Sequence, residues 1–384
     1  MLKEKTQFYV DYIGCEKRKL DAQKIIYYFK ANDFIQSENI SDADIILYIT
    51  CAFIKEFEEI SIDNIKLINK ERKEQSKFII GGCLPSINPL RLKNIENIGI
   101  LPLRETERID NIIKSQVKYQ EIPDPNITQF ENRFHNGKKI NIHYSKYREE
   151  YEKAKRGYKI RLNYGCLGNC SYCVTRFATK ELKSKPVNDV IKEFKGAISK
   201  NIDTIFFTGG DSGAYGLDIN TNIVEILKKI FVINGEYKIY FQDFGIQWLI
   251  KFFDDLLLLF KKNKKNIGLL NFPIQSGSNR ILKNMRRPYR IEDVIEELSY
   301  FNRLMPDIHL GTHLIVGFPG ETKKDFKKTL NLLDKIRFSF IYIFKYSDNP
   351  LADSYDLKGK IDESIKEMRY KLLLEKYLKK INLN

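Results

Sequence analysis

The chain has 384 residues, of which 43% are hydrophobic and 30% charged, and its formal net charge is +15. This length suits two or three domains, and the composition is that of a globular protein. No run approaches the roughly 18–20 apolar residues of a membrane span. The first residues also lack the cleavage site of a signal peptide, so we expect a cytoplasmic protein with no membrane partner.

The excess of basic residues would suit a polyanionic partner such as RNA. Lysine is abundant throughout the chain, however, including in stretches such as 66–77 that read as solvated helix faces. Charge alone therefore does not decide between an RNA partner and a compositional bias of the whole chain. We do not expect DNA as a partner.

The first 125 residues alternate short apolar runs with longer amphipathic stretches. Residues 8–14, 44–50 and 77–82 read as buried strands, and residues 20–32 and 59–75 carry apolar positions at helical spacing. The order β-α-β-α-β predicts an N-terminal α/β domain with a parallel sheet over residues 1–125.

A cysteine directly follows each of these three predicted strands, at Cys15, Cys51 and Cys83. Ligands of open parallel sheets bind beyond the carboxyl ends of the strands, so three cysteines placed there can converge on one point. Singly, each would more often be an inert core thiol. Because the chain has six cysteines and no secretory signal, we expect metal, cluster or nucleophile chemistry rather than a disulfide framework.

Residues 126–156 are polar, show little periodicity and predict a linker. Six further strands are predicted after Gly157, at 158–164, 203–209, 238–244, 267–272, 309–317 and 338–346, with helical stretches such as 187–199 and 220–231 between the first ones. Six βα units predict a partial, TIM-like (βα)6 barrel over residues 157–347, with its active site at the carboxyl ends of the strands. Residues 348–384 predict a loop and a short C-terminal helix at roughly 362–380.

The segment YGCLGNCSYC places Cys166, Cys170 and Cys173 in a C-x3-C-x2-C spacing just after a barrel strand. Three thiolates on one loop can bind three irons of a [4Fe–4S] cluster and leave the fourth iron open. Zinc is the rival, but a structural zinc site needs four ligands and no further Cys or His lies close by. Inert thiols would not explain the glycines Gly165 and Gly168, which let a loop turn tightly around a ligand.

This motif resembles that of the radical S-adenosylmethionine (SAM) superfamily. The resemblance implies that the open iron chelates the methionine part of SAM, that an electron from the cluster cleaves SAM, and that the resulting 5′-deoxyadenosyl radical abstracts hydrogen from an unactivated carbon. Tyr172 is common at its position in the superfamily, either packed on the cluster or taking part in catalysis.

Further strings narrow the resemblance to the methylthiotransferases. YIGCEKRKLDA, ILYITCAFIKE and IIGGCLPS are similar to that family's three cysteine segments, and with FTGGDSGAYG, FPIQSGSNRILKNMRR and HLIVGFPGET the resemblance covers nearly all of residues 7–350. It implies that Cys15, Cys51 and Cys83 hold an auxiliary [4Fe–4S] cluster whose open iron carries the transferred sulfur. One SAM would methylate that sulfur and another would supply the radical, giving a C–S–CH3 product.

The resemblance also implies contacts to SAM or substrate after the barrel strands. Glycines there permit close backbone approach, and a carboxylate can accept bonds from the ammonium group of SAM. A tight turn that needs glycine is the alternative. Basic loop residues could neutralise a phosphate or the SAM carboxylate, although such residues are usually just solvated. The cofactor contacts that the resemblance implies are Tyr172, Thr208, Gly209, Gly210, Asp211, Gln275, Ser276 and Gly317. The basic loop residues are Arg286, Arg287 and Arg290.

The chain departs from the family pattern in three places. Arg18 stands where the family usually has Asn, His313 replaces an acidic residue, and the segment after Cys173 keeps only Arg176 of its usual motif. We also expect no C-terminal TRAM β-barrel, which residues 350–384 cannot supply.

Three functions stay open from the sequence. The first is methylthiolation of a tRNA adenosine next to the anticodon, of the N6-threonylcarbamoyladenosine type, because DSGAYG is closer to that branch. The second is methylthiolation of a peptide or protein side chain, such as a natural-product precursor or a ribosomal protein. The third is a non-enzymatic iron–sulfur or zinc module. The enzymatic functions need an electron donor such as flavodoxin or ferredoxin.

Overall fold

The computed structural model describes residues 5–129, 142–144, 147–179 and 181–382. The chain divides into two compact units, Met1–Lys138 with Val174–Lys180, and Lys139–Cys173 with Glu181–Asn384. The sequence did not predict that the segment directly after Cys173 belongs to the first unit. The predicted domain boundaries stay predictions, and residues 130–141 of the predicted linker lie outside the described residues.

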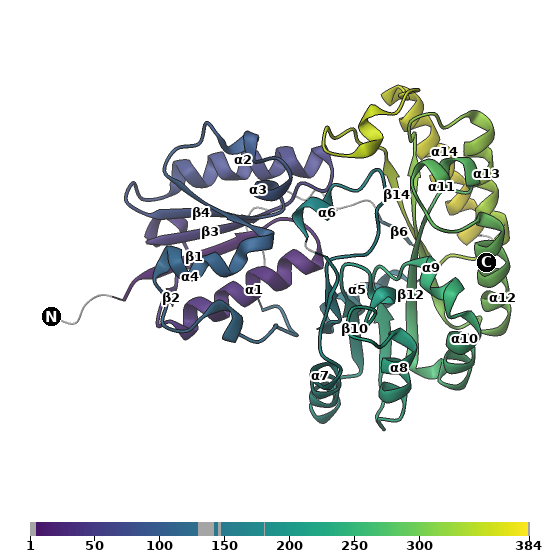
Figure 1. Cartoon of the computed structure of the whole chain (residues 1–384), viewed down its shortest axis with the longest axis horizontal. Coiled ribbons are helices and arrows are strands. Elements are labelled where there is room, and N and C mark those ends of the chain that lie inside the picture. Colours follow the sequence, from purple (N-terminus) through teal and green to yellow (C-terminus); the bar gives the residue numbers. More distant parts are fainter. Residues whose placement is uncertain (1–4, 130–141, 145–146, 180, 383–384) are drawn as a thin grey trace. The chain divides into compact units, whose positions relative to one another are not determined.

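The first unit is built on a five-stranded parallel sheet with strand order β2-β1-β3-β4-β5. Helices α1 and α4 lie on one face of the sheet and α2 lies on the other (Figure 1). All six residues of β3 are buried, as expected of a central strand covered on both faces. The elements are β1 (Gln7–Tyr12), α1 (Glu16–Ala31), β2 (Ile35–Gln36), β3 (Ile45–Thr50), α2 (Lys55–Glu71), β4 (Lys77–Gly82), α3 (Leu84–Ile87), β5 (Ile98–Pro102), α4 (Ile109–Ile113) and α6 (Thr175–Ala178).

The second unit contains a seven-stranded sheet with strand order β6-β14-β13-β12-β11-β10-β7. Six strands are parallel, and β6 joins β14 antiparallel. The sheet does not close, because β6 and β7 both remain at its edges, so the expected partial barrel is confirmed. The strands are β6 (Ile142–Tyr144), β7 (Tyr158–Arg161), β10 (Thr204–Thr208), β11 (Lys238–Phe241), β12 (Ile267–Gln275), β13 (His309–Val316) and β14 (Phe340–Lys345).

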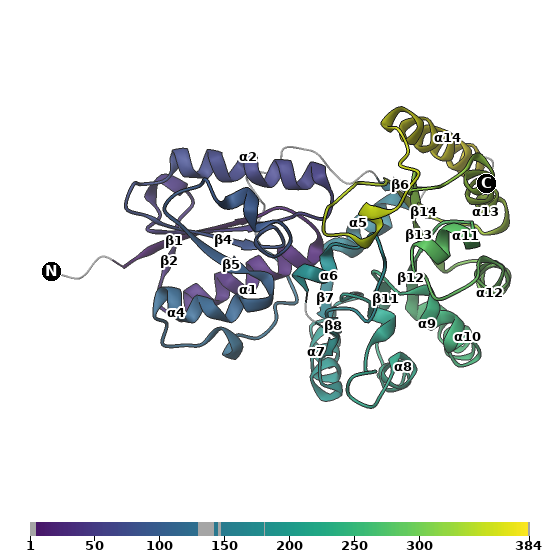
Figure 2. The ribbon, with the colours of Figure 1, turned by 45° about the horizontal axis from the view of Figure 1, so that its top comes forward.

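Helices α7, α8, α10, α12 and α13 lie outside the curved sheet of this unit (Figure 2). The helices are α5 (Arg148–Arg156), α7 (Val187–Ser199), α8 (Ile223–Phe231), α9 (Ile246–Lys251), α10 (Phe253–Lys262), α11 (Asn279–Asn284), α12 (Ile291–Leu304), α13 (Lys323–Lys335) and α14 (Glu363–Asn382). No helix in the described ranges is long and apolar enough to cross a membrane.

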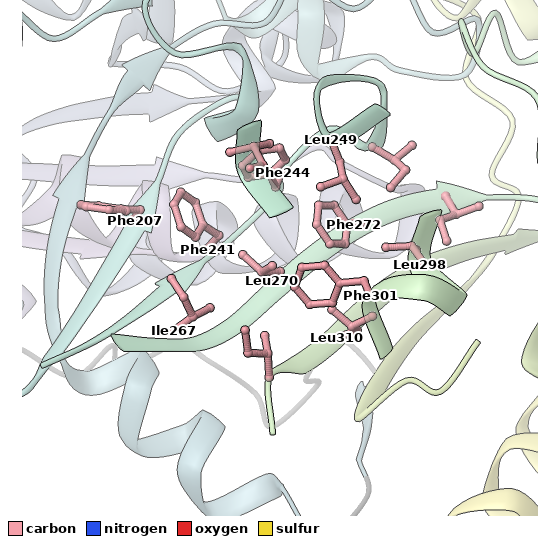
Figure 3. Packing of buried hydrophobic residues seen from close by; sticks show 14 of the residues in the cluster. Phe207, Phe241, Phe244, Leu249, Ile267, Leu270, Phe272, Leu298, Phe301 and Leu310 are labelled. Atoms are coloured by element: carbon pink, nitrogen blue, oxygen red, sulfur yellow. The ribbon is translucent and has the colours of Figure 1, made fainter. Parts of the chain in front are cut away.

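Alternate residues of the strands face opposite sides of the sheet. The outward side chains form one apolar core with the helices, which includes Phe241 and Phe272 of the strands and Phe301 of α12 (Figure 3). The inward side chains change character along the strands. An apolar cluster contains Phe206, Tyr240, Leu269 and Phe340.

A polar row lies one step closer to the carboxyl ends of the strands. Arg161 pairs in register with Thr208, Thr208 Oγ1 donates to Gln242 Oε1, and Asn271 pairs in register with Gly311. Arg161, Thr208 and Asn271 are all buried. Because polar side chains are costly in an apolar core, this row marks the end of the barrel where a polar ligand is best accommodated.

The first predicted barrel strand is divided in the structure. Residues 158–164 form β7 and then β8 (Asn163–Tyr164), which leaves the barrel sheet and pairs antiparallel with β9 (Lys183–Ser184). Periodicity alone does not distinguish one strand of seven residues from two shorter ones. The division releases the chain into the loop that carries Cys166.

We expect Phe272→Ala to lower the free energy of unfolding of the second unit by about 3–5 kcal/mol, because its ring is fully buried in the outer core. Leu258→Ala on α10 is the matched control, since Leu258 is 69% exposed, and it should change stability by no more than about 0.5 kcal/mol. Denaturant titration followed by circular dichroism measures both. Equal effects of the two substitutions would contradict the assigned core.

Candidate functional site

The structure places Cys15, Cys51 and Cys83 at one edge of the first unit's sheet. Cys15 is the N-cap residue of α1, Cys51 directly follows β3, and Cys83 directly follows β4. Strands β1, β3 and β4 are consecutive neighbours and run parallel, so their carboxyl ends share that edge.

The three thiols also interact with one another. A Cβ built on Gly14, the residue before Cys15, would lie 3.5 Å from Cys51 Sγ. Burial raises the pKa of the Cys51 thiol far above its ordinary value, and the thiols of Cys83 and Cys15 raise it further. Three thiolates here would be unstable alone, and a bound iron–sulfur cluster would supply the positive charge that they require.

Arg18 lies beside this trio on the first turn of α1. Its side chain is buried, Nη1 lies 3.8 Å from Cys83 Sγ, and Nη2 forms an ion pair with Asp21 Oδ2 at 2.9 Å. The departure from the family pattern noted at this position therefore puts a guanidinium group against a predicted cluster ligand.

The second trio lies on one loop of the second unit. A Cβ built on Gly168 would lie 3.2 Å from Cys166 Sγ and 3.7 Å from Cys170 Sγ, so both sulfurs flank the same glycine. The Gly168 N–H also donates to Cys166 Sγ at 3.1 Å. Cys173 follows three residues after Cys170, and its backbone N–H donates to the Cys170 carbonyl at 3.1 Å.

Backbone contact with the end of β10 holds this loop in place. A Cβ on Gly210 would lie 1.6 Å from the carbonyl oxygen of Gly165, a distance that no side chain can occupy. Asn163 joins the two segments, because its Oδ1 accepts from the Gly210 N–H at 2.9 Å and its Nδ2 donates to the Asp211 carbonyl at 2.7 Å. Gly210 therefore contributes to the site by allowing the loop that carries Cys166 to pack against the end of β10.

The far side of the loop is tied to the end of α11. The Ser171 N–H donates to the Met285 carbonyl at 3.1 Å, and Ser171 Oγ donates to the Asn284 carbonyl at 2.7 Å. Two residues later, Arg287 Nη1 donates to Cys170 Sγ at 3.2 Å. In the basic segment predicted to neutralise a phosphate or SAM, one guanidinium group thus contacts a predicted cluster ligand.

The other two arginines of that segment have carboxylate partners. Arg286 forms an ion pair with Asp353, and Arg290 lies 3.4 Å from Glu292. Tyr172, predicted to pack on the cluster, lies in the loop with its ring against the small apolar cluster that contains Phe318 and Tyr346.

The residues predicted after β10 are bonded within the protein. Thr208 Oγ1 donates to Gln242 Oε1 at 2.8 Å. The Asp211 carboxylate accepts from the Gly245 N–H at 2.8 Å and from Trp248 Nε1 at 2.7 Å, and it also accepts from Gly213 and Gln247. Asp211 therefore fixes the loop after β11, and the Cβ position of Gly209 is filled by Asn163.

Gln275 differs from these residues because its side-chain carbonyl oxygen has no hydrogen-bond donor among the described residues. It is buried at the end of β12 with φ of +75°, in the left-handed region, and its Oε1 accepts no hydrogen bond from the described residues. A buried carbonyl oxygen without a donor is costly, so this oxygen suits a ligand's N–H or ammonium group. It is the observation that best fits SAM.

Ser276 and Gly317 lie against neighbouring elements. Ser276 Oγ contacts Thr329 Oγ1 of α13 at 3.4 Å. Gly317 has φ of +74°, its N–H donates to Glu321 Oε2 at 2.8 Å, and a Cβ there would meet Lys366 of α14 at 2.4 Å. Both positions thus serve the packing of the barrel in this structure.

Sequence reasoning missed Asn163 and Asn271. Asn163 was read as part of an apolar strand, and its role depends on Gly210, which lies forty-seven residues away. Asn271 Nδ2 lies 2.9 Å from His313 Nε2, and its Oδ1 has no hydrogen-bond partner within the described residues. A polar residue within a buried strand was the available signal in both cases.

Two family models match the sequence, that of the Radical SAM superfamily over residues 160–333 and that of the uncharacterized protein family UPF0004 over residues 7–101. Among solved structures, the radical SAM methyltransferase TsrM from Kitasatospora setae, with cobalamin and a [4Fe–4S] cluster bound, has a TM-score of 0.64 at 12% identity and covers 91% of this chain and 77% of that one. This likeness concerns the fold alone.

Curated relatives are similar over nearly the whole chain. The threonylcarbamoyladenosine tRNA methylthiotransferase MtaB of Thermotoga maritima is 29% identical over 96% of this chain and 81% of its own length. The tRNA-2-methylthio-N(6)-dimethylallyladenosine synthase of Thermodesulfovibrio yellowstonii is 31% identical, with 94% and 80% covered. The ribosomal protein uS12 methylthiotransferase RimO of Thermosipho melanesiensis is 28% identical, with 96% and 82% covered.

A partial barrel with a C-x3-C-x2-C loop at its carboxyl end, together with the superfamily match, defines a radical SAM enzyme. The chain belongs to the methylthiotransferase family within that superfamily. Its cofactors are SAM and two [4Fe–4S] clusters. No three His, Cys, Asp or Glu side chains in the described part of the chain lie close enough to hold a single metal ion.

Gly210→Ala should displace the cluster loop, because the new Cβ would overlap the Gly165 carbonyl. We expect iron in the reconstituted protein to fall from about eight to about four per chain, the content of one remaining cluster. The matched control is Gly196→Ala on α7, because a Cβ at that position would meet nothing closer than 4.0 Å. This substitution should stabilise the helix by up to about 1 kcal/mol. Full iron in Gly210→Ala would refute the steric argument.

Proposed function

We propose that the enzyme methylthiolates an adenosine next to the anticodon of tRNA, with N6-threonylcarbamoyladenosine as the modified base. The proposal is carried by relatives whose names specify this reaction and which cover most of both chains. The formal net charge of +15 supports a polyanionic substrate. Such a substrate places the enzyme in the cytoplasm.

Each unit would contribute one set of cluster ligands. Cys166, Cys170 and Cys173 would hold the cluster that binds SAM, and Cys15, Cys51 and Cys83 would hold the auxiliary cluster. When bound, these groups supply the radical that activates the substrate C–H bond and the sulfur that replaces the hydrogen. A one-electron donor such as flavodoxin or ferredoxin completes the system.

The protein's own residues orient the reactants at the carboxyl end of the barrel. Gln275 Oε1 would accept a hydrogen bond from the SAM ammonium group, which is supported by its lack of a donor among the described residues. Asn271 Oδ1, likewise unsatisfied, lies in the polar row on the inner face. Two carbonyl acceptors in a buried site favour ligands that present N–H groups, and adenosine and its carbamoyl substituent do so.

A side chain of a ribosomal protein is the second candidate substrate. The uS12 methylthiotransferase relatives are about as similar to the chain as the tRNA enzymes. The DSGAYG string, which resembled the threonylcarbamoyladenosine branch, is buried at all six residues, 211–216. Because the Asp211 carboxylate is bonded to protein donors, the string does not by itself favour one of the two substrates.

The cofactor assignment is tested by replacing each trio with alanine. We expect the wild-type chain to hold about eight irons after anaerobic reconstitution and each triple variant about four, because each trio holds one cube. The variant C166A/C170A/C173A should lose reductive cleavage of SAM, whereas C15A/C51A/C83A should keep it and lose methylthio transfer. Iron analysis and chromatography of 5′-deoxyadenosine measure these outcomes. Four irons in the wild-type protein would contradict the assignment.

The substrate is tested by giving the reconstituted enzyme, SAM and reductant to tRNA from cells that lack this gene, and in parallel to ribosomal protein uS12. We expect one methylthio group on N6-threonylcarbamoyladenosine by nucleoside mass spectrometry, and none on the protein. Because phosphate contacts release counterions, tRNA binding should weaken steeply with salt, by roughly 10³-fold or more between about 50 and 200 mM if six to ten phosphates are contacted. Modification of the protein alone would refute the proposal.

A further inference from the structure

Each cysteine trio has one arginine that points at a sulfur atom. In the second unit, Arg287 Nη1 donates to Cys170 Sγ at 3.2 Å. In the first unit, Arg18 Nη1 lies 3.8 Å from Cys83 Sγ. The two contacts belong to different units and arise from unrelated elements, the segment after α11 and the first turn of α1.

Arg287 is fixed in its orientation by every nitrogen of its guanidinium group. Nε donates to Tyr289 Oη at 2.9 Å and Nη2 donates to the Pro273 carbonyl at 3.0 Å. Tyr289 Oη in turn donates to the Ile274 carbonyl at 2.7 Å. Within the described residues Arg287 forms no ion pair with a carboxylate, although its charge also acts on the buried carboxylate of Asp211. Its one hydrogen bond to a sulfur directs the guanidinium group at the cysteine loop.

Arg18 has a different electrostatic setting. Its Nη2 pairs with Asp21 Oδ2 at 2.9 Å, and both side chains are only 7% exposed. A buried carboxylate at this distance cancels much of the field of the guanidinium group. The longer distance to the sulfur and the paired charge both make the effect of Arg18 on its trio weaker than that of Arg287.

We propose that Arg287 is a positioning residue that raises the reduction potential of the SAM-binding cluster, and that the Arg18–Asp21 pair leaves the auxiliary cluster with little such help. The proposal rests on the cluster assignment made under Proposed function. A [4Fe–4S]²⁺ core with three thiolates carries a charge of about −1, and the electron from a flavodoxin- or ferredoxin-type donor makes it about −2, with no bond made or broken. A nearby cation stabilises the more negative state, and hydrogen bonds to sulfur act in the same direction.

The functional consequence is selective reduction. The SAM-binding cluster must receive an electron for each SAM cleavage, while the auxiliary cluster has to keep its sulfur. An arginine that hydrogen-bonds a sulfur at one trio, and an ion-paired arginine farther from the sulfur at the other, favour the donor's electron on the SAM-binding cluster.

Redox titration of single clusters in the full-length chain tests the proposal. C15A/C51A/C83A isolates the SAM-binding cluster, and C166A/C170A/C173A isolates the auxiliary cluster. In the first background, R287Q should lower the equilibrium constant for reduction about tenfold, which is about 59 mV for one electron, and R287K should recover most of the loss. Electron paramagnetic resonance of the reduced cluster, without SAM, gives the midpoint.

Substitutions beside the auxiliary cluster test the same charge effect in the opposite direction. In the second background, D21N should raise the reduction equilibrium several-fold by freeing the charge of Arg18, whereas R18Q should lower it by less than R287Q lowers that of the other cluster. If R287Q fails to bind iron, the R287K variant tests the proposal instead, because lysine keeps the positive charge and lacks the planar set of donors of the guanidinium group. If the equilibrium constant for reduction in R287K lies within about twofold of the parent value, the charge effect is supported. A tenfold fall of that constant overturns it.

The two proposals fail in different ways. Absence of a cluster from an unsubstituted trio would refute the cluster assignment. Full iron content with unchanged midpoints in R287Q and D21N would overturn only the tuning role, and the cluster assignment would stand.

Discussion

Thiolates gathered at the ends of parallel strands repel one another, and much of the structure around the two trios compensates that repulsion. In the first unit the topology creates the problem, because adjacent strands β1, β3 and β4 deliver Cys15, Cys51 and Cys83 to one sheet edge. Burial and the neighbouring thiols raise the pKa of Cys51 far above its usual range. A metal cluster lowers the cost of ionising these groups more than any local hydrogen bond could. Gathering of the three cysteines at one sheet edge is therefore what a cluster-ligand role would require.

The second unit meets the same constraint with a loop instead of a sheet edge. A loop can turn around its ligand, but it needs external support, which comes from Asn163 and Gly210 on one side and Ser171 on the other. The Gly168 N–H and the guanidinium of Arg287 then donate to the sulfurs themselves. Rigid support matters because a ligand set must be held within a fraction of an ångström to bind one cube. The carboxylate of Asp211 contributes indirectly, by anchoring the neighbouring loop after β11.

Sequence reasoning predicted most strands of the two sheets and the position of Cys51 and Cys83 at strand ends, because strand periodicity is a local property, but it missed β5 and β6 and the division of β7 from β8. It did not reach the contacts that support the site. Arg18 meets Cys83 across 65 residues and Arg287 meets Cys170 across 117, and no local pattern encodes such partners. Asp211 was expected to face SAM, whereas the structure saturates its carboxylate with protein donors. A polar residue after a strand is equally suited to binding a ligand or a loop, and only tertiary contacts distinguish the two.

Substrate choice has to reside in side chains that face the ligand, which narrows where it can be encoded. Residues 211–216 are buried, and the Asp211 carboxylate is bonded to protein donors. The inner polar row is different, because Asn271 keeps an unsatisfied oxygen there and contacts His313, the residue that replaces an acidic one. His313 also lies 4.0 Å from Asp243 Oδ1. An acidic group and an imidazole thus lie side by side at the strand ends of the barrel. A substrate bound there would meet both groups, so a change of the residue at position 313 would alter the hydrogen-bonding groups offered to it without altering the barrel.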